Sequence, residues 1–343
     1  MTNIEWTDAT WSPVTGCTKV SAGCRNCYAE TVADRFWGKQ YGTVDGERRR
    51  FTDVWTHPER LDEPLRWRKP RRVFVNSMSD LFHEAVPDEF IDRVFAVMAI
   101  SNYVGRCRAR DCQHEPCESV DKPLAHSFQV LTKRPDRMRV YVRTPGRIDA
   151  VAEAAGMLGN WYIGDGALDA MSWPLPNVWL GVSAENQETA DERIPILLDT
   201  PAAVRFVSAE PLLGPIDLLS VTFPHARMNV LEGVGVATRG VVGQSMPNAF
   251  SNKLDWIITG GESGPRARPC DVVWIRGIVE QCKAANVACF VKQLGSFSTH
   301  AVEVGRFTGS EEHPEKHRNR HMASKGCDPS EWPVDLCVRE FPA

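Results

Sequence analysis

Apolar runs rich in β-branched and aromatic residues alternate along the chain with stretches of helical periodicity. The runs predict strands at Trp11–Gly16, Arg72–Met78, Ser127–Thr132, Val178–Ser183, Val204–Ser208, Trp256–Thr259 and Ala288–Gln293. The helical stretches are Cys27–Trp37, Asp88–Ile100, Ala184–Leu198 and Val272–Ala285. Nearly continuous apolar strands that alternate with helices are typical of a parallel sheet covered by helices. We therefore expect an α/β fold, either an open or partial βα-barrel or a doubly wound sheet.

Three stretches break this alternation, and we interpret them as insertions on one core that spans residues 1–298. They are residues 104–126, which are rich in Cys, residues 143–176, which are rich in Gly and Ala, and residues 221–252, which are rich in Gly. Residues 299–343 form a tail that contains the charged sequence EEHPEKHRNRH. The tail ends in EWPVDLCVREFP, whose apolar side chains are expected to dock back on the core.

The chain has 40 Lys and Arg residues against 44 Asp and Glu residues, which gives a net charge of −4. This balance excludes a protein held to nucleic acid by bulk charge, although a local basic groove could still bind it. No apolar run approaches the ~20 residues that a membrane-spanning helix needs. The N-terminal sequence MTNIEWTDATW lacks the basic and apolar regions of a signal peptide. We therefore expect a cytoplasmic protein with no membrane partner.

Polar and charged residues follow six of the predicted strands, in NSMSDLFH, TKRPDRM, SAENQE, SAEPLLG, TGGESG and KQLGS. The carboxyl ends of parallel strands lie at one edge of a sheet, where α/β proteins place their functional sites. Turns alone do not require this many charged and amide side chains. We therefore expect these strand ends to line a site.

The segment GCTKVSAGCRNCYAE contains three of the 11 cysteines, Cys17, Cys24 and Cys27, with the spacing C-x6-C-x2-C. Clustered thiols in a protein without a secretory signal indicate metal binding or catalysis more than disulfides. Three thiolates leave one position open, because a structural zinc site and a [4Fe–4S] cluster both normally take four ligands. The residues alone leave three interpretations: an iron–sulfur cluster, a zinc site completed by a distant residue, or unconnected buried thiols.

A second group of soft and borderline ligands lies in the sequence CRARDCQHEPC, which is too polar for a core segment. Its ligands are Cys107, Cys112, His114 and Cys117, a Cys3His set of the kind that binds zinc. We expect a zinc knuckle that stabilises this insertion. Exposed free thiols and a second iron–sulfur cluster are the alternatives.

Taken together, the cysteine segment and the motifs NSMSDLFH, FQVLTKRPDRM, WLGVSAENQ, FVSAEPLLGPI, WIITGGESGP, FVKQLG and EWPVDLCVREFP resemble a phage protein family. This family is named for gene products thirty-seven and sixty-eight. It is in turn similar to radical S-adenosylmethionine (SAM) enzymes of the spore photoproduct lyase branch. The resemblance implies a partial (β/α)6-type barrel with insertions and a C-terminal tail. The spacing departs from the usual radical SAM motif, C-x3-C-x2-C, in its first interval.

The resemblance also implies a mechanism. Cys17, Cys24 and Cys27 would hold three irons of a [4Fe–4S] cluster, and the fourth iron would bind the amino and carboxylate groups of SAM. One electron then cleaves SAM to methionine and a 5′-deoxyadenosyl radical, which abstracts a hydrogen from the substrate. A flavodoxin- or ferredoxin-like protein would supply the electron.

The SAM contacts implied by the resemblance lie after the second and fourth strands, beside the last cysteine of the segment and on the helix that follows the fourth strand. Tyr28 would pack beside the cluster or the adenine, and Arg193 would pair with the SAM carboxylate. A surface ion pair with a helix acid is the alternative for Arg193. The methionyl contacts would be Asn76, Ser77, Ser79 and Asp80, and the ribose contacts would be Ser183, Glu185 and Asn186.

The expected substrate is a nucleotide or nucleic-acid base in a phage DNA-modification or repair-like pathway, in the host cytoplasm. Lys133 and Arg134 are predicted to contact phosphates. Glu210, Glu262 and Lys292 are further predicted substrate contacts, and Glu262 closes a Gly-Gly-Glu motif that radical SAM enzymes usually carry after the second strand. Two other functions stay open: a zinc-binding, nucleic-acid-associated accessory protein, and a barrel enzyme without a metal.

Overall fold

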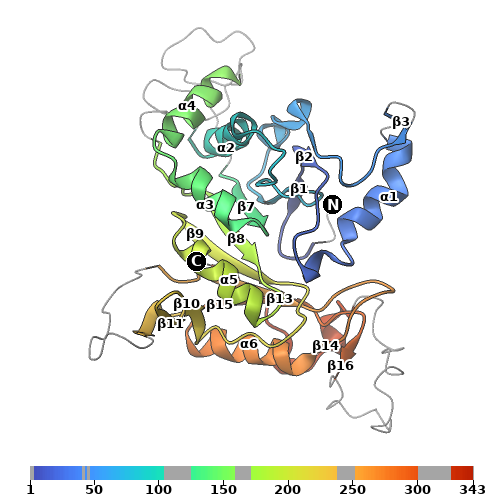
Figure 1. Cartoon of the computed structure of the whole chain (residues 1–343), viewed down its shortest axis with the longest axis vertical. Coiled ribbons are helices and arrows are strands. Elements are labelled where there is room, and N and C mark those ends of the chain that lie inside the picture. Colours follow the sequence, from blue (N-terminus) through green and yellow to red (C-terminus); the bar gives the residue numbers. More distant parts are fainter. Residues whose placement is uncertain are drawn as a thin grey trace. The chain divides into compact units, whose positions relative to one another are not determined.

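Two compact units make up the chain in the computed structural model, which describes residues 4–40, 43–44, 47–103, 125–158, 171–237, 252–299 and 326–342. The first unit comprises Met1–Lys19, Cys27–Leu180 and Thr200–Ala203. The second comprises Val20–Asn26, Gly181–Asp199 and Val204–Ala343. Figure 1 traces both units in sequence colours. The short turn that carries Cys24 belongs to the second unit, whereas Cys17 and Cys27 belong to the first.

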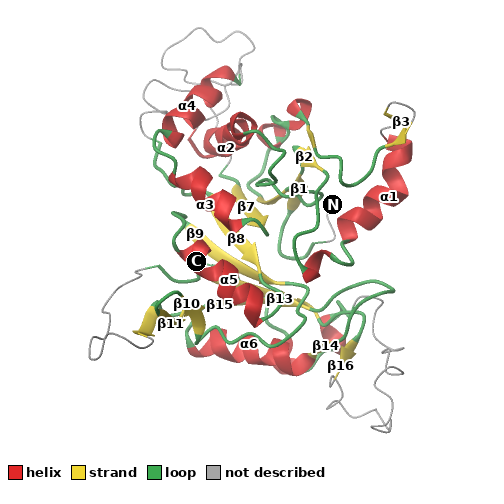
Figure 2. Ribbon diagram, viewed as in Figure 1, coloured by secondary structure: helices red, strands yellow, loops and turns green. Residues whose placement is uncertain are grey.

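Helices and short strands alternate through both units (Figure 2). The α-helices are α1 (Tyr28–Gln40), α2 (Asp88–Tyr103), α3 (Pro135–Arg143), α4 (Arg147–Met157), α5 (Gln187–Leu198) and α6 (Val272–Ala284). The main strands are β1 (Ala9–Trp11), β6 (Arg72–Val75), β7 (Ser127–Thr132), β8 (Val178–Ser183), β9 (Val204–Ala209), β13 (Trp256–Gly260) and β15 (Ala288–Gln293). The minor strands are β2 (Val14–Thr15), β3 (Thr43–Val44), β4 (Glu47–Arg48), β5 (Trp55–Thr56), β10 (Val221–Phe223), β11 (Ala226–Asn229), β12 (Val234–Ala237), β14 (Cys270–Asp271) and β16 (Ser298–Thr299). Single 3-10 turns lie at Ala22–Cys24, Pro58–Arg60, Pro64–Arg66, Pro329–Glu331 and Val334–Leu336.

The seven main strands hydrogen-bond in the order β1-β6-β7-β8-β9-β13-β15. In the first unit β6 pairs in parallel with β1 and with β7. In the second unit β13 pairs in parallel with β9 and with β15. The expectation of an α/β fold built on a parallel sheet is therefore confirmed.

The core of the first unit is built from aromatic rings on its strands and from a helix pair. Trp11 lies 5.8 Å from Phe128, measured between ring centroids, and both side chains are fully buried. Helix α4 buries Val151 and Ala155 and packs beside α2 (Figure 1). Residues 147–157, within the stretch that we interpreted as an insertion, therefore contribute to the core.

The core of the second unit continues into the end of the chain. Helix α6 buries Ile275, Ile278 and Cys282 and contacts β13 and β15. The Val291 N–H donates to the Val338 carbonyl at 2.8 Å, and the Phe341 ring lies 5.4 Å from that of Trp256. Residues 338–341 thus cover the outer side of β15, which is the last strand of the sheet. Covering an edge strand in this way protects its backbone groups from pairing with another chain.

Two predicted strands differ from the structure. The predicted strand Trp11–Gly16 is split, because β1 ends at Trp11 and Val14–Thr15 pairs instead with β5. Pro13 lies between the two pieces and has no N–H to continue a ladder. The second strand ends at Val75 rather than Met78, because Asn76 has a φ of 61°.

The structure also contains elements that the sequence pattern does not predict. Helix α3 is short, and four of its nine residues, Asp136, Arg137, Arg139 and Arg143, are charged. Strands β10, β11 and β12 form a three-stranded sheet within residues 221–237, in the Gly-rich stretch. In the described ranges, no helix is both long enough and apolar enough to cross a membrane. The predicted zinc ligands Cys107, Cys112, His114 and Cys117, and residues 300–325 of the tail, lie outside the described residues.

Candidate metal and cofactor site

At Gly16, where the cysteine segment begins, the backbone passes very close to the backbone of Phe51 and Asp53. Gly16 has a φ of 94°, and a Cβ at this position would lie 2.4 Å from the Asp53 carbonyl oxygen. The Gly16 N–H donates to the Met78 carbonyl at 3.1 Å, and the Cys17 N–H donates to the Phe51 carbonyl at 2.9 Å. Only glycine combines this conformation with this close approach. The backbone at Cys17 is therefore held from both sides.

Cys17 and Cys27 contact the same apolar cluster in the first unit. Both side chains pack, together with Met78, against a set of buried residues, Ala29, Ala33, Trp37 and Phe51. Cys27 immediately precedes α1, and its carbonyl accepts the Thr31 N–H at 3.2 Å. Both thiols are half-buried, so they combine an apolar surrounding with access for a ligand.

Arg134 is the charged residue that reaches Cys17. Its Nη1 lies 3.6 Å from the Cys17 Sγ and 3.4 Å from Asp80 Oδ2, and its Nε donates to Glu84 Oε1 at 3.0 Å. Its Nη2 donates to the carbonyl and the hydroxyl of Thr18 at 3.2 Å and 2.9 Å. Burial opposes the charge, but Asp80, Cys17 and Glu84 together raise the pKa of Arg134. The guanidinium therefore stays charged beside the thiol.

Asp80 binds this arginine, and both of its carboxylate oxygens accept hydrogen bonds. Its Oδ1 accepts the Thr132 hydroxyl at 2.7 Å and the Phe82 N–H at 3.0 Å. Its Oδ2 accepts the Lys133 N–H at 3.0 Å as well as Arg134. Both oxygens of Asp80, which we predicted as a SAM contact, therefore accept hydrogen bonds from protein groups.

Asn76 lies at the end of β6 with one unsatisfied polar atom. Its Oδ1 accepts the Val14 N–H at 3.1 Å, and the side chain is almost completely buried. Among the described residues, no group bonds its Nδ2. A buried donor without a partner costs about 1–3 kcal/mol, so a ligand that accepts from it would be favoured.

The other predicted contacts after β6 face backbone groups. The Tyr28 hydroxyl donates to the Ser77 carbonyl, and the Ser79 Oγ donates to the Val14 carbonyl at 2.9 Å. The Ser77 Oγ lies 3.5 Å from the Ser12 Oγ. Tyr28 is 52% exposed, so a ligand could reach this residue.

In the second unit, Glu185 holds the turn that carries Cys24. Its Oε1 accepts the Ser21 hydroxyl at 2.7 Å, and its Oε2 accepts Arg193 Nη1 at 3.2 Å. Arg193 also donates to the Ser183 carbonyl at 2.8 Å. A Cβ on Gly23 would lie 2.1 Å from Glu185 Oε1, so the backbone of the turn contacts the carboxylate directly. The alternative that we considered for Arg193, an ion pair with a helix acid, is present, because its Nε lies 3.9 Å from Glu192 Oε2, and the buried pair with Glu185 is additional.

A second carboxylate, Glu262, holds the same turn from the other end. Its oxygens accept Arg268 Nη2 at 2.7 Å and Asn26 Nδ2 at 3.0 Å, and Arg268 Nη1 donates to the Ala22 carbonyl at 2.8 Å. Burial alone would raise the pKa of Glu262, but the hydrogen bonds from Arg268 and Asn26 hold it below its ordinary value of 4.5. The Glu of the Gly-Gly-Glu motif is therefore an anchor of the cysteine segment.

The remaining predicted residues lie at the strand ends of the second unit. Lys292 Nζ pairs with Glu210 Oε2 at 3.2 Å, and a Cβ on Gly260 would lie 2.6 Å from Glu210 Oε1. Asn186 caps α5, because its Oδ1 accepts the Thr189 N–H at 3.0 Å. The site also contains residues that were not predicted, among them Thr18, Asn26 and Arg268, and for Arg268 the sequence carries no motif.

The described residues contain no group of three His, Cys, Asp or Glu side chains that could hold a metal ion. The eight described cysteines form no disulfide. Within its own unit, each of Cys17, Cys24 and Cys27 lies in a segment with defined anchors. The three thiols are therefore available as metal ligands on segments held by hydrogen bonds, but they are not already grouped around one point.

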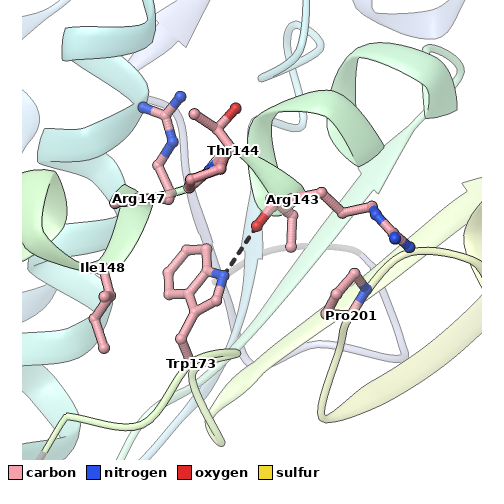
Figure 3. Close-up of a pocket in the computed structure, with 9 residues that line it drawn as sticks. Arg143, Thr144, Arg147, Ile148, Trp173 and Pro201 are labelled. Atoms are coloured by element: carbon pink, nitrogen blue, oxygen red, sulfur yellow. Dashed lines mark hydrogen bonds between the residues drawn. The ribbon is translucent and has the colours of Figure 1, made fainter.

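A cavity of about 430 Å³ lies in the first unit, between the end of α3 and the start of α4 (Figure 3). Trp173 forms one wall, and its indole N–H donates to the Val142 carbonyl at 3.0 Å. Arg147 also lines the cavity, but its guanidinium is bound to Asp88 and Asp92. None of the predicted site residues lines this cavity.

The fold and the cysteine segment define an α/β protein with a parallel sheet and three thiol donors shortly after its first strand. The chain belongs to the family described as "Protein of unknown function (DUF5131)", which matches residues 1–104 and 110–332. No curated protein and no solved structure matches the chain.

Proposed function

We propose that the protein is a radical SAM enzyme in which Cys17, Cys24 and Cys27 bind a [4Fe–4S] cluster. The observation that carries the proposal is the set of three thiols within 11 residues, each in an anchored segment. Thiolates are the ligands that iron–sulfur clusters take, and three of them leave one iron for a small molecule. The chemistry supplied there would be one-electron cleavage of SAM to methionine and a 5′-deoxyadenosyl radical.

The surroundings of Cys17 and Cys27 support this proposal. An apolar wall that includes Trp37 and Phe51 limits access of water to the sulfur atoms. The guanidinium of Arg134 offers a hydrogen bond to Cys17, which favours the thiolate over the thiol. Clusters are sensitive to both solvent exposure and hydrogen bonds at sulfur.

The proposed SAM contacts follow β6. Asn76 would donate from its unpartnered Nδ2 to an acceptor on SAM, and the exposed ring of Tyr28 would pack on the nucleoside. The carboxylates of Glu185 and Glu262 hold the Cys24 turn in this proposal rather than the cofactor. The barrel-like closure of the sheet, typical of radical SAM enzymes, is part of the same proposal.

The proposed substrate class is a nucleotide or nucleic-acid base, as in the enzymes that the motifs resemble. Lys133 follows β7 with a half-buried side chain, and Lys292 and Glu210 form an ion pair at the ends of β15 and β9. These three residues are the proposed substrate contacts. A small redox protein would supply the electron.

The test is formation of 5′-deoxyadenosine from SAM by the anaerobically purified and reconstituted protein under a strong reductant. We expect the wild-type chain to form 5′-deoxyadenosine. Cys24→Ala should lose more than roughly 100-fold in rate, because removing one of several residues that act together in catalysis costs orders of magnitude. The matched control is Cys337→Ala, an exposed cysteine in the tail, which should retain the wild-type rate. Equal turnover in the Cys24→Ala variant, or a protein that binds only zinc, would contradict the proposal.

A further inference from the structure

Arg134 has no donor left for a substrate. A guanidinium carries five N–H groups. In this chain they point to Glu84, to Asp80, to the Cys17 sulfur and to the carbonyl and hydroxyl of Thr18. The side chain is also only 5% exposed. A role in binding phosphates, as the sequence suggests, would require these contacts to break.

From this geometry we infer that Arg134 is a positioning residue for the Cys17 thiolate, and that it raises the reduction potential of the cluster bound there. This inference rests on the proposed function. It goes beyond it by assigning Arg134 a role toward the sulfur ligand in place of one toward the substrate.

The acids around Arg134 determine how it acts. Asp80 and Glu84 together offset its positive charge, and Glu84 is 67% exposed. The effect at Cys17 therefore depends on the directed N–H group at 3.6 Å more than on net charge. Hydrogen bonds to cluster sulfurs raise the potential, because they stabilise the more negative, reduced state.

Thr18 fixes the direction of this N–H group. Arg134 Nη2 binds both polar oxygens of the residue that follows Cys17, and the Thr18 hydroxyl also lies 2.9 Å from His83 Nε2. Arg134 thus binds the side chain of Cys17 and the carbonyl and hydroxyl of Thr18. Loss of the arginine would free the Cys17 side chain to rotate as well as remove its hydrogen bond.

The test compares the midpoint potential of the reconstituted full chain with those of Arg134→Gln, Arg134→Lys and Arg137→Gln. Arg137 is the matched control, because it lies three residues further on, in helix α3, and donates to the His83 and Val86 carbonyls rather than to a cysteine. We expect Arg134→Gln to make reduction about tenfold less favourable, equivalent to a potential about 59 mV lower for a one-electron couple. Arg134→Lys should give a smaller decrease, and Arg137→Gln should match the wild-type chain.

The outcomes separate the two proposals. A wild-type chain without iron and sulfide after reconstitution overturns the proposed function, and the present inference with it. A wild-type chain with a cluster whose potential is unchanged in Arg134→Gln overturns the present inference alone. If Arg134→Gln does not fold, Arg134→Lys decides: a potential below that of Arg137→Gln supports the inference, and an equal potential overturns it.

Discussion

The two ends of the cysteine segment are held by opposite chemistry. Near Cys17, in the first unit, the anchor is a cation, because Arg134 binds the sulfur and the next residue. Around Cys24, in the second unit, the anchors are two carboxylates, Glu185 and Glu262. The arginine contacts the thiol itself, whereas Glu185 accepts the Ser21 hydroxyl and Glu262 accepts the Asn26 amide. A cation at the sulfur favours a thiolate, and carboxylates kept off the sulfur avoid repelling it.

The largest expected effect follows from removing one carboxylate. Glu185→Gln removes the buried ionic partner of Arg193, whose other carboxylate, Glu192 at 3.9 Å, is 62% exposed. This change should cost about 3–5 kcal/mol of the free energy of unfolding. Glu262→Gln should cost less, about 1–3 kcal/mol, because Arg268 keeps 21% of its side chain in contact with water. Urea denaturation of both variants measures the difference. An equal loss of unfolding free energy in the two variants would show that the burial of the arginine partner does not determine the effect.

A smaller effect is expected from filling the space between the turn and Glu185. Gly23→Ala places a Cβ against Oε1 and should destabilise the chain by about 1–3 kcal/mol. The control is Gly277→Ala in helix α6, where a Cβ meets no atom within 4 Å and should stabilise by about 0.8–1 kcal/mol. Thermal denaturation of the two variants provides the comparison. A neutral Gly23→Ala would mean that the contact with Glu185 is not tight.

The smallest effect is a pH dependence of stability at the carboxylate end of the cysteine segment. The pKa of Glu262 is lowered in the folded chain, so the unfolded chain binds its proton first as the pH falls. The stabilisation is therefore complete above the ordinary value of 4.5 and is lost as the pH falls below it through the lowered pKa.

This pH dependence is measured as the difference in unfolding free energy between the wild-type chain and Glu262→Gln. The difference should be greatest near pH 6 and shrink steadily on acidification below pH about 4.5. A difference that is constant across this range would show that Glu262 has an unperturbed carboxyl group in the folded chain.

Much of the fold could be predicted from the sequence, because buried parallel strands leave clear apolar runs. Ser127–Thr132, Val178–Ser183 and Ala288–Gln293 have the predicted bounds. Helix α4 was missed because its buried face is largely alanine, which gives little periodicity. The early end of β6 depends on the left-handed conformation of Asn76, which its neighbours in the sequence do not specify.

Several residues of the candidate site could be named from the sequence, but the groups that they contact could not. Charged residues at strand ends read equally well as ligand contacts or as anchors, since both need hydrogen-bonding side chains. Glu262 and Arg134 were predicted to contact the substrate, and the structure shows both of them bound to residues of the cysteine segment. The partner Arg268 could not be found from the sequence, because it contacts Ala22 across 246 positions of the chain.

The most direct measurement of the central claim is the iron and sulfide content of the chain purified without oxygen. We predict about four iron and four sulfide ions per wild-type chain, with loss of most of both in Cys17→Ala, Cys24→Ala and Cys27→Ala but not in Cys337→Ala. A wild-type chain that contains only zinc, or three cysteine variants that retain the wild-type iron and sulfide, would contradict the account.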